Sequence, residues 1–241
     1  MNKDRGPIFL KYLLLIVVLV SSVIFTNCRQ TMQTYILDDI NIIESDNNFV
    51  SEVKLLNMLA NNDINIDSII PNSLTKQSIE DLIKTKSGVR NVEVFSNQKG
   101  GINVVVEQKK AIARIKSNTD DYFIDEYGKK IIRSSNSAQK LVIFTGDISY
   151  IDHVKIRDFT IKINKSDFWS ALITQIHFED NNIFLIPRLG SQKINIGDFE
   201  NIETKLENLH HFYKVAMPAK GWQLYTEINL KYNNQIVCAK K

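Results

Sequence analysis

The sequence predicts an α+β protein of 241 residues. Three observations lead to this prediction: an apolar run near the N-terminus, a helix–helix–hairpin pattern in the first half, and short β-rich runs in the second half. We expect an N-terminal single transmembrane helix, a small domain with two helices on a short sheet, and a mainly antiparallel β domain with two helices. The predicted boundaries are 1–7 for a cytoplasmic tail, 8–26 for the transmembrane helix, 27–34 for a tether, 35–110 for the small domain and 111–241 for the β domain.

The apolar run extends from Ile8 to Thr26 and contains one charged residue, Lys11. A helix of this length spans roughly 30 Å, about the thickness of the bilayer hydrocarbon, and Lys11 can extend its ammonium group to the interface. Basic residues gather before the run, so the positive-inside rule predicts a single pass through a membrane, with the N-terminus in the cytoplasm and the body outside it. The residues expected to span the membrane are Ile8, Leu13, Leu14, Leu15, Ile16, Val17, Val18, Leu19, Val20, Val23, Ile24 and Phe25.

Two alternatives compete with a permanent anchor. In a cleaved signal peptide the small residues Ser21 and Ser22 would precede the cleavage site, but no Ala-x-Ala site follows and the apolar run continues to Phe25. In a lipoprotein Cys28 would be the anchor, but the residues before it are not the small ones that such a site needs. The sequence therefore favours the transmembrane helix.

The small domain begins with a predicted strand over 35–43. The run Asp46-Asn47-Asn48 then predicts the start of a helix, because apolar residues recur at helical spacing after it. These apolar residues are Phe49, Val53, Leu56 and Ala60.

A second short helix and a hairpin complete this domain. Thr75 or Ser78 can cap the helix, whose apolar stripe is Ile79, Leu82 and Ile83, and Gly88 follows its end. Two β-rich runs at 89–95 and 102–107 flank a loop of turn-forming residues, which predicts a β-hairpin.

From Ala111 the pattern is mainly β. A short helix is expected after Ser166, with Phe168, Leu172 and Ile176 on one face. The predicted strands lie at 112–115, 122–124, 131–132, 141–144 and 183–186.

The best helix of the chain is predicted to start at Asp198, and its apolar residues are Phe199, Ile202, Leu206, Leu209 and Phe212. Strict alternation from Trp222 to Tyr232 then predicts a strand with the even-numbered residues on one side. Asn233-Asn234 suits a tight turn, and a last strand over Gln235–Ala239 would form the edge of the sheet.

The sequence shows no catalytic constellation. The net charge of +3 provides no nucleic-acid footprint, and two cysteines and four histidines without ligand spacing predict no metal site. Ser137 and Lys140 match the Ser-x-x-Lys pattern of penicillin-interacting serine enzymes, but Ser137 falls in a predicted polar loop. We therefore expect no catalytic residues, no cofactor and no small-molecule substrate, and a binding or scaffold protein instead of an enzyme.

The whole layout resembles the FtsQ/DivIB family of bacterial cell-division proteins. Family members have a short cytoplasmic tail, one transmembrane helix, a POTRA (polypeptide-transport-associated) domain and a C-terminal β domain. The resemblance covers essentially the full chain, and the order of the segments carries it. These segments are GVRNVEVFSNQKGGINVVVEQKKAIARI, YFIDEYGKKI, LVIFTGDI, IPRLGSQKINIGDFENIETKLENLHHFY and INLKYNNQIV.

The resemblance implies a non-enzymatic scaffold of the divisome that is anchored in the bacterial inner membrane at the division septum, with its body in the periplasm. This scaffold links early septal proteins to septal peptidoglycan synthesis. It implies contacts with the coiled-coil proteins FtsB (DivIC) and FtsL, and with other divisome membrane proteins. The residues point to the same place, because an unpaired edge strand can receive a partner strand. We expect Tyr232, where the family has an interface tyrosine, to anchor this contact or to pack in the core. The expected partner-binding residues are Leu230, Lys231, Tyr232, Asn233, Asn234, Gln235, Ile236, Val237 and Cys238.

Two other classes of protein compete with a divisome scaffold. A POTRA-bearing protein-transport or envelope-assembly factor is the alternative, but no repeat of barrel-forming amphipathic strands follows the single POTRA-like unit. A peptidoglycan enzyme is disfavoured because the sequence offers no catalytic constellation.

Overall fold

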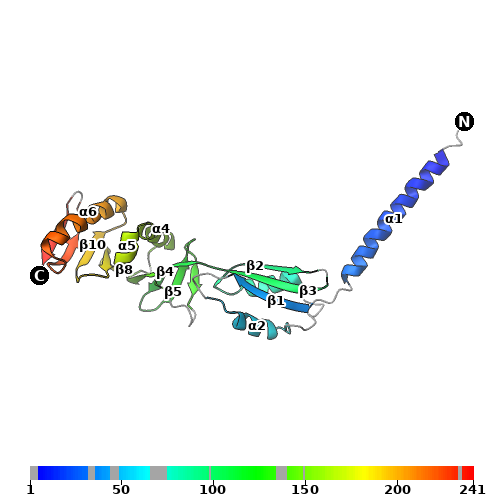
Figure 1. The fold of residues 1–241 in the computed structure, drawn as a ribbon, viewed down its shortest axis with the longest axis horizontal. Helices are drawn as coiled ribbons and strands as arrows, with labels where there is room; N and C mark the ends of the chain where they lie inside the picture. The colour runs from blue at the N-terminus through cyan, green and yellow to red at the C-terminus, as the bar shows by residue number, and fades with distance from the viewer. Residues whose placement is uncertain are drawn as a thin grey trace. The chain divides into compact units, whose positions relative to one another are not determined.

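The computed structural model of the chain describes residues 5–31, 36–43, 49–65, 75–97, 99–133, 140–148, 150–232 and 235–241 (Figure 1). It divides into two compact units. The first contains residues 1–41, 52–83 and 92–105, and the second contains residues 42–51, 84–91 and 106–241. The domain boundaries predicted at 35–110 and 111–241 remain a prediction.

The N-terminal helix α1 is Arg5–Thr31, and its side chains are described over residues 11–26. Within the described ranges, no helix combines the length and the apolar character that a membrane crossing requires. The prediction of a transmembrane helix over 8–26 is therefore wrong, and the single-pass topology that was inferred from it is not supported.

The first sheet has three strands in the order β1-β3-β2. Its elements follow one another as β1 (Ile36–Ile43), α2 (Glu52–Ala60), α3 (Lys76–Lys84), β2 (Val89–Ser96) and β3 (Gly101–Gln108). The Thr75 hydroxyl accepts a hydrogen bond from the Ser78 backbone N–H at 3.1 Å, so Thr75 caps α3. The buried residues of the first unit include Leu37, Ile40, Leu55, Leu59, Ile79, Ile83, Val92, Val94, Ile102 and Val104.

Helix α2 buries a different face from the predicted one. Leu55 and Leu59 are buried, whereas Val53 is 67% exposed. The helix begins at Glu52 and Phe49 precedes it, so the spacing counted from Phe49 does not continue through the helix. The proposed start at Asp46 lies outside the described residues.

The second sheet has nine strands in the order β12-β11-β10-β9-β8-β7-β4-β5-β6. Of its eight neighbouring pairs, β10–β11, β4–β7 and β7–β8 are parallel and the other five are antiparallel. The strands are β4 (Ala111–Lys116), β5 (Asp121–Asp125), β6 (Lys130–Ile132), β7 (Val142–Gly146), β8 (Ile173–Glu179), β9 (Asn182–Pro187), β10 (Lys193–Gly197), β11 (Tyr225–Asn229) and β12 (Val237–Lys240). The chain is thus an α+β protein with one large mixed sheet.

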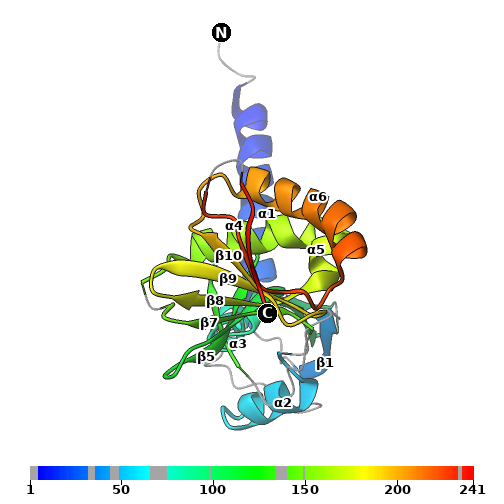
Figure 2. The ribbon, with the colours of Figure 1, turned by 90° about the vertical axis from the view of Figure 1, so that its left-hand side faces the viewer.

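Three helices pack on one face of this sheet: α4 (His153–Asn164), α5 (Asp167–Leu172) and α6 (Ile202–Lys220) (Figure 2). The helices α4 and α5 connect the parallel strands β7 and β8, and α6 connects the parallel strands β10 and β11. Both crossovers advance across the sheet in the same direction, so the shared handedness of such connections places their helices on the same side. An ion pair between Lys162 of α4 and Glu203 of α6 joins two helices of this layer directly.

Two elements of this unit differ from the prediction. We expected two helices, but α4 is a third; Asp152 caps it by accepting the Val154 backbone N–H at 2.9 Å. We also expected Phe168, Leu172 and Ile176 on one helix, but α5 ends at Leu172 and Ile176 lies in β8. Ile176 is fully buried there, so its apolar character fits a strand as well as a helix.

The strand predicted from Trp222 to Tyr232 is shorter and carries a bulge. β11 covers Tyr225–Asn229, and its register with β12 shifts between Tyr225 and Glu227. One additional residue reverses the alternation of faces, so Tyr225 and Ile228 are both buried while Thr226 is exposed. The expectation that all even-numbered residues share one face is therefore wrong.

Candidate partner-binding edge

Strand β12 ends the nine-stranded sheet and pairs only with β11 within the described part of the chain. The pairing is antiparallel and joins Asn229 to Val237 and Ile228 to Cys238. The Lys241 N–H donates to the Leu224 carbonyl at 3.1 Å, which extends the ladder past the end of β12. The opposite side of β12 is therefore an open sheet edge.

The alternation of an antiparallel ladder tells which groups face this open edge. Hydrogen-bonding groups point to opposite sides on successive residues, and the Lys241 N–H points toward β11. The N–H groups of Lys240 and Cys238 consequently point away from β11. Among the described residues neither donor has a partner, and both face the open side of the sheet.

The turn before β12 brings exposed side chains to the same corner. Tyr232 is 59% exposed and Val237 is 49% exposed. The Gln235 N–H donates to the Tyr232 carbonyl at 3.4 Å, which closes the turn between the two strands. An aromatic ring and an aliphatic side chain are thus presented at the edge where β12 begins.

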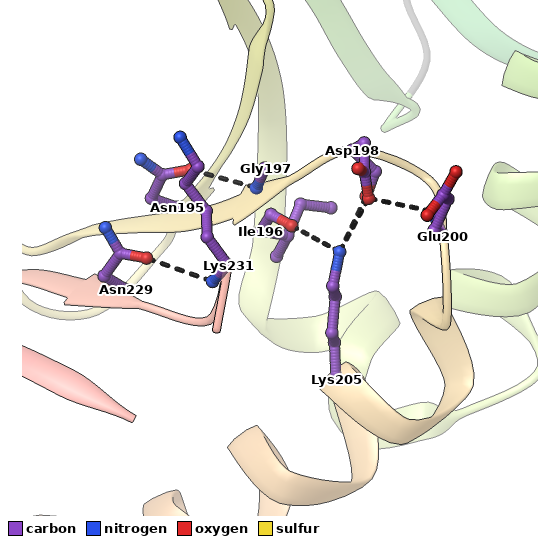
Figure 3. Close-up of polar contacts among 8 residues, drawn as sticks. All are labelled: Asn195, Ile196, Gly197, Asp198, Glu200, Lys205, Asn229 and Lys231. Carbon is purple, nitrogen blue, oxygen red and sulfur yellow. Dashed lines mark hydrogen bonds and ion pairs between the residues drawn. The ribbon is translucent and has the colours of Figure 1, made fainter. Parts of the chain in front are cut away.

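The corner is held in place by the end of β10 and the start of α6. The Leu230 N–H donates to the Asn195 carbonyl at 2.7 Å, and the Lys231 N–H donates to Asn229 Oδ1 at 3.0 Å. Gly197 has a φ of +74°, and the Lys231 side chain lies across it. Figure 3 shows Asn195, Gly197 and Lys231 close together at this point.

Lys205 ties the first turn of α6 to the end of β10 (Figure 3). Its ammonium group donates to the Ile196 carbonyl at 2.8 Å and to Asp198 Oδ1 at 2.8 Å. The hydrogen bond from Lys205, together with the one that Asp198 Oδ1 accepts from the Glu200 N–H, lowers the pKa of the Asp198 carboxyl. Asp198 was expected to cap α6, but the helix begins at Ile202 after Asn201 in a left-handed conformation.

A groove of about 250 Å³ lies between α6 and the turn before β12. Asn201, Thr204, Lys205 and Asn208 form its helical wall, and Leu230, Tyr232 and Gln235 form the other wall. The described residues that line this groove include no Asp or Glu, and most of their polar side chains carry an amide or a hydroxyl. It therefore suits polar side chains that flank a strand docked on β12.

The predicted partner-binding residues are divided between surface and core. Lys231, Tyr232, Gln235 and Val237 are exposed, and Ile236 and Cys238 are half-buried against the core. Leu230 is 3% exposed and belongs to the core, and Asn233 and Asn234 lie outside the described residues. Burial raises the pKa of the Cys238 thiol.

Sequence reasoning missed the helical wall of the groove. Asn201, Thr204 and Asn208 read only as the polar face of an amphipathic helix, and no local signal distinguishes that face from any other solvated face. Ser137, whose match to the Ser-x-x-Lys pattern was set aside above, lies outside the described residues.

Comparison with known protein families identifies the part of the chain that contains this edge. The family model described as FtsQ/DivIB, C-terminal related matches residues 110–239, from the start of β4 to β12. The comparison with curated proteins found no match. Because the matched region covers more than half of the 241 residues, the chain belongs to the FtsQ/DivIB, C-terminal related family, a family of cell-division proteins.

Proposed function

We propose that this cell-division protein is a scaffold of the bacterial divisome that acts at the septum and links early septal proteins to the peptidoglycan synthesis machinery. It does so by binding segments of other division proteins, and the candidates are FtsB/DivIC-like and FtsL-like coiled-coil proteins. The open edge of β12 is the observation that supports this proposal most strongly, because it lies within the matched region.

The binding mode is the addition of a partner strand to β12. Backbone hydrogen bonds to a sheet edge provide affinity, and pockets for side chains provide specificity. The outward N–H groups of Cys238 and Lys240 supply donors, and the groove beside Tyr232 supplies a pocket. Exposed edge strands are otherwise an aggregation hazard, and Lys240 and Lys241 add charge at the end of this one.

The test removes one outward donor while leaving the pairing with β11 intact. Proline at position 238 has no N–H and is tolerated on an edge strand when its N–H side faces solvent. We expect Cys238→Pro to weaken binding of the full-length chain to the C-terminal segment of an FtsB-like protein by tenfold or more. Cys238→Ala keeps the N–H and is the matched control, so it should bind within about twofold of the parent chain.

Circular dichroism and thermal unfolding must show that both variants remain folded. If Cys238→Pro binds as tightly as Cys238→Ala, the partner does not pair with β12, and the scaffold proposal loses its supporting contact. If neither the parent chain nor the variants bind an FtsB-like or FtsL-like segment, the assignment of partners is wrong.

A further inference from the structure

A second surface of the same unit carries two cations that the proposed edge contact does not use. It is a pocket of about 350 Å³ at the N-terminal ends of the parallel strands β7 and β8. That size lies near the lower limit of ligand pockets, which hold roughly 300–1,000 Å³. The pocket is lined by Ile112, Lys140, Leu141, Val142, Ile143, Asn164, Ser170, Ile173, Thr174 and Arg188.

The position of this pocket separates it from the β12 edge. The groove beside Tyr232 lies at the C-terminal ends of β10 and β11, whereas this pocket lies at the N-terminal ends of β7 and β8. In the sheet order, β8 is four strands from β12. With strands about 4.8 Å apart, the open edge of β12 is roughly 19 Å across the sheet from the β8 side of this pocket.

The pocket carries positive charge without a matching carboxylate. Its lining contains Lys140 and Arg188 and no acidic residue. Neither cation forms an ion pair with any residue in the described ranges, and the segment 134–139 that precedes Lys140 contains no Asp or Glu. The C-terminal end of α4 contributes only a partial negative charge there, which two full positive charges outweigh.

A backbone hydrogen bond fixes the position of Arg188, and two hydroxyl groups of the pocket already donate to backbone carbonyls. The Arg188 N–H donates to the Leu172 carbonyl at 2.7 Å, directly after β9 ends at Pro187. The Ser170 hydroxyl donates to the Asp167 carbonyl and the Thr174 hydroxyl donates to the Ile186 carbonyl. Among the described residues that line the pocket, the side-chain donors that remain for a ligand are the guanidinium of Arg188, the ammonium of Lys140 and the amide of Asn164.

We propose that this pocket, the Lys140–Arg188 pocket, binds an acidic segment of a second partner protein, with a Glu or Asp carboxylate between the two cations. The aliphatic side of the pocket, formed by Ile112, Leu141 and Ile173, receives an apolar residue next to that carboxylate. Arginine suits this role because its planar guanidinium binds carboxylates in bidentate fashion. The net charge of only +3 and the absence of a basic stripe disfavour nucleic acid as the occupant.

The probe is the blocked peptide Ala-Leu-Glu-Leu-Ala, compared with its Glu→Gln analogue, and the protein is the full-length chain. We expect the acidic peptide to bind at least tenfold more tightly than the analogue. In two-dimensional amide NMR spectra, its addition should shift the signals of Ile173, Thr174 and Arg188. Raising the salt concentration should weaken the binding, because the contact is ionic.

Charge reversal provides the mutational test. Lys140→Glu with Arg188→Glu should raise the dissociation constant of the acidic peptide tenfold or more. Lys214→Glu is the matched control, since Lys214 is an exposed cation of α6 outside the pocket; it should change the constant less than twofold. Cys238→Pro should leave the peptide affinity unchanged, so failure of this pocket and failure of the β12 contact are distinguishable.

The proposal would be overturned if the two peptides bound equally well, or if the amide shifts were confined to other parts of the chain. It would also be overturned if the charge reversals in the pocket and at the control position had equal effects. Sodium acetate that binds the pocket as tightly as the acidic peptide would also overturn it, because the site would then recognise a simple anion and not a peptide segment.

Discussion

The Cγ of Lys231 lies 2.8 Å from the position that a Cβ on Gly197 would occupy. Gly197 also has a φ of +74°, a conformation that residues with a Cβ adopt only at a cost. The end of β10 and the turn after β11 therefore pack so closely that only glycine fits between them. Because this turn carries Tyr232, the packing at Gly197 also positions the candidate partner-binding edge.

We predict that Gly197→Ala lowers the free energy of unfolding by about 1–3 kcal/mol, the usual cost of a strained backbone conformation. Chemical denaturation of the purified chain measures this change. Part of the loss is a clash with Lys231, so the same substitution in a Lys231→Ala background should cost about 1 kcal/mol less. Equal costs in the two backgrounds would show that the side chain of Lys231 yields freely.

Gly221→Ala is a useful comparison for this experiment. Gly221 has a φ of +94°, but, its chain neighbours aside, no heavy atom of the described residues lies within 4 Å of an added Cβ. Its substitution carries the conformational cost without a clash. It should therefore show no dependence on the Lys231 background, and binding of the FtsB-like segment should remain at the parental affinity.

We predict that Tyr232→Ala weakens binding of the FtsB-like segment by roughly 30-fold, which corresponds to about 2 kcal/mol for a buried interface tyrosine. Tyr232 is 59% exposed in the unbound chain, so its removal should leave stability nearly unchanged. Tyr150→Ala is the matched control, since Tyr150 is 58% exposed and lies outside the groove. Titration calorimetry of the three chains measures the difference, and an equal loss in both variants would remove Tyr232 from the interface.

The acid stability of the second unit should depend on Asp121. Arg114 donates to its two carboxylate oxygens at 2.8 and 2.7 Å, and Arg133 donates to Oδ2 at 2.7 Å. These hydrogen bonds, that from Arg114 first, lower the pKa of Asp121 below its ordinary value of 3.8. A lowered pKa stabilises the folded state fully above the unfolded pKa, and this contribution is lost as the pH falls through the folded pKa.

Asp121→Asn should therefore cost about 1 kcal/mol or less near neutral pH, because the pair is partly exposed to solvent. The difference from the parent chain should shrink as the pH falls below 3.8 and through the lowered pKa of Asp121 in the folded state. Urea denaturation at several pH values measures both quantities. Asp158→Asn is the control, because it removes an exposed ion pair with the neighbouring Arg157, and it should have a smaller effect at neutral pH. A difference for Asp121→Asn that does not depend on pH would contradict the ionic explanation.

The thiol of Cys238 should report whether β12 is docked. Burial raises its pKa, so less thiolate is present at neutral pH than for a free cysteine. In a Cys28→Ser chain, we expect labelling of Cys238 by a thiol reagent to be slower in the folded state than in denaturant, and to accelerate as the pH rises. Equal rates in the folded and denatured states would mean that β12 is detached from β11.

Several elements could be predicted from the sequence because the signal is local. The hairpin of β2 and β3 was expected at 89–95 and 102–107, and its strands are Val89–Ser96 and Gly101–Gln108. The helix at Ile202–Lys220 and the C-terminal edge strand were likewise expected near their observed positions. In each case periodicity, turn residues and chain order lie within a few residues of one another.

Other elements could not be read in this way. The fully apolar character of Ile176 fits a helix or a buried strand equally well, and only pairing with β7 and β9 makes it part of β8. The apolar run of α1 led to a transmembrane prediction that the described helix does not meet. Hydrophobicity alone indicates that a segment avoids water. It does not tell whether the segment is a helix, a strand or a membrane span.

By itself, the sequence determined the α+β class, the family resemblance, and the location of an edge strand at the C-terminal end of the chain. The tertiary structure alone decided which residues surround that edge. The bulge between Tyr225 and Glu227 sets the faces of β11, and α6 supplies the second wall of the groove beside Tyr232. Lys140 and Arg188 likewise meet in one pocket although 48 positions (188 − 140) separate them in the sequence. Local patterns report the periodicity of one segment, whereas such sites form only when strands distant in sequence pair and place their ends together.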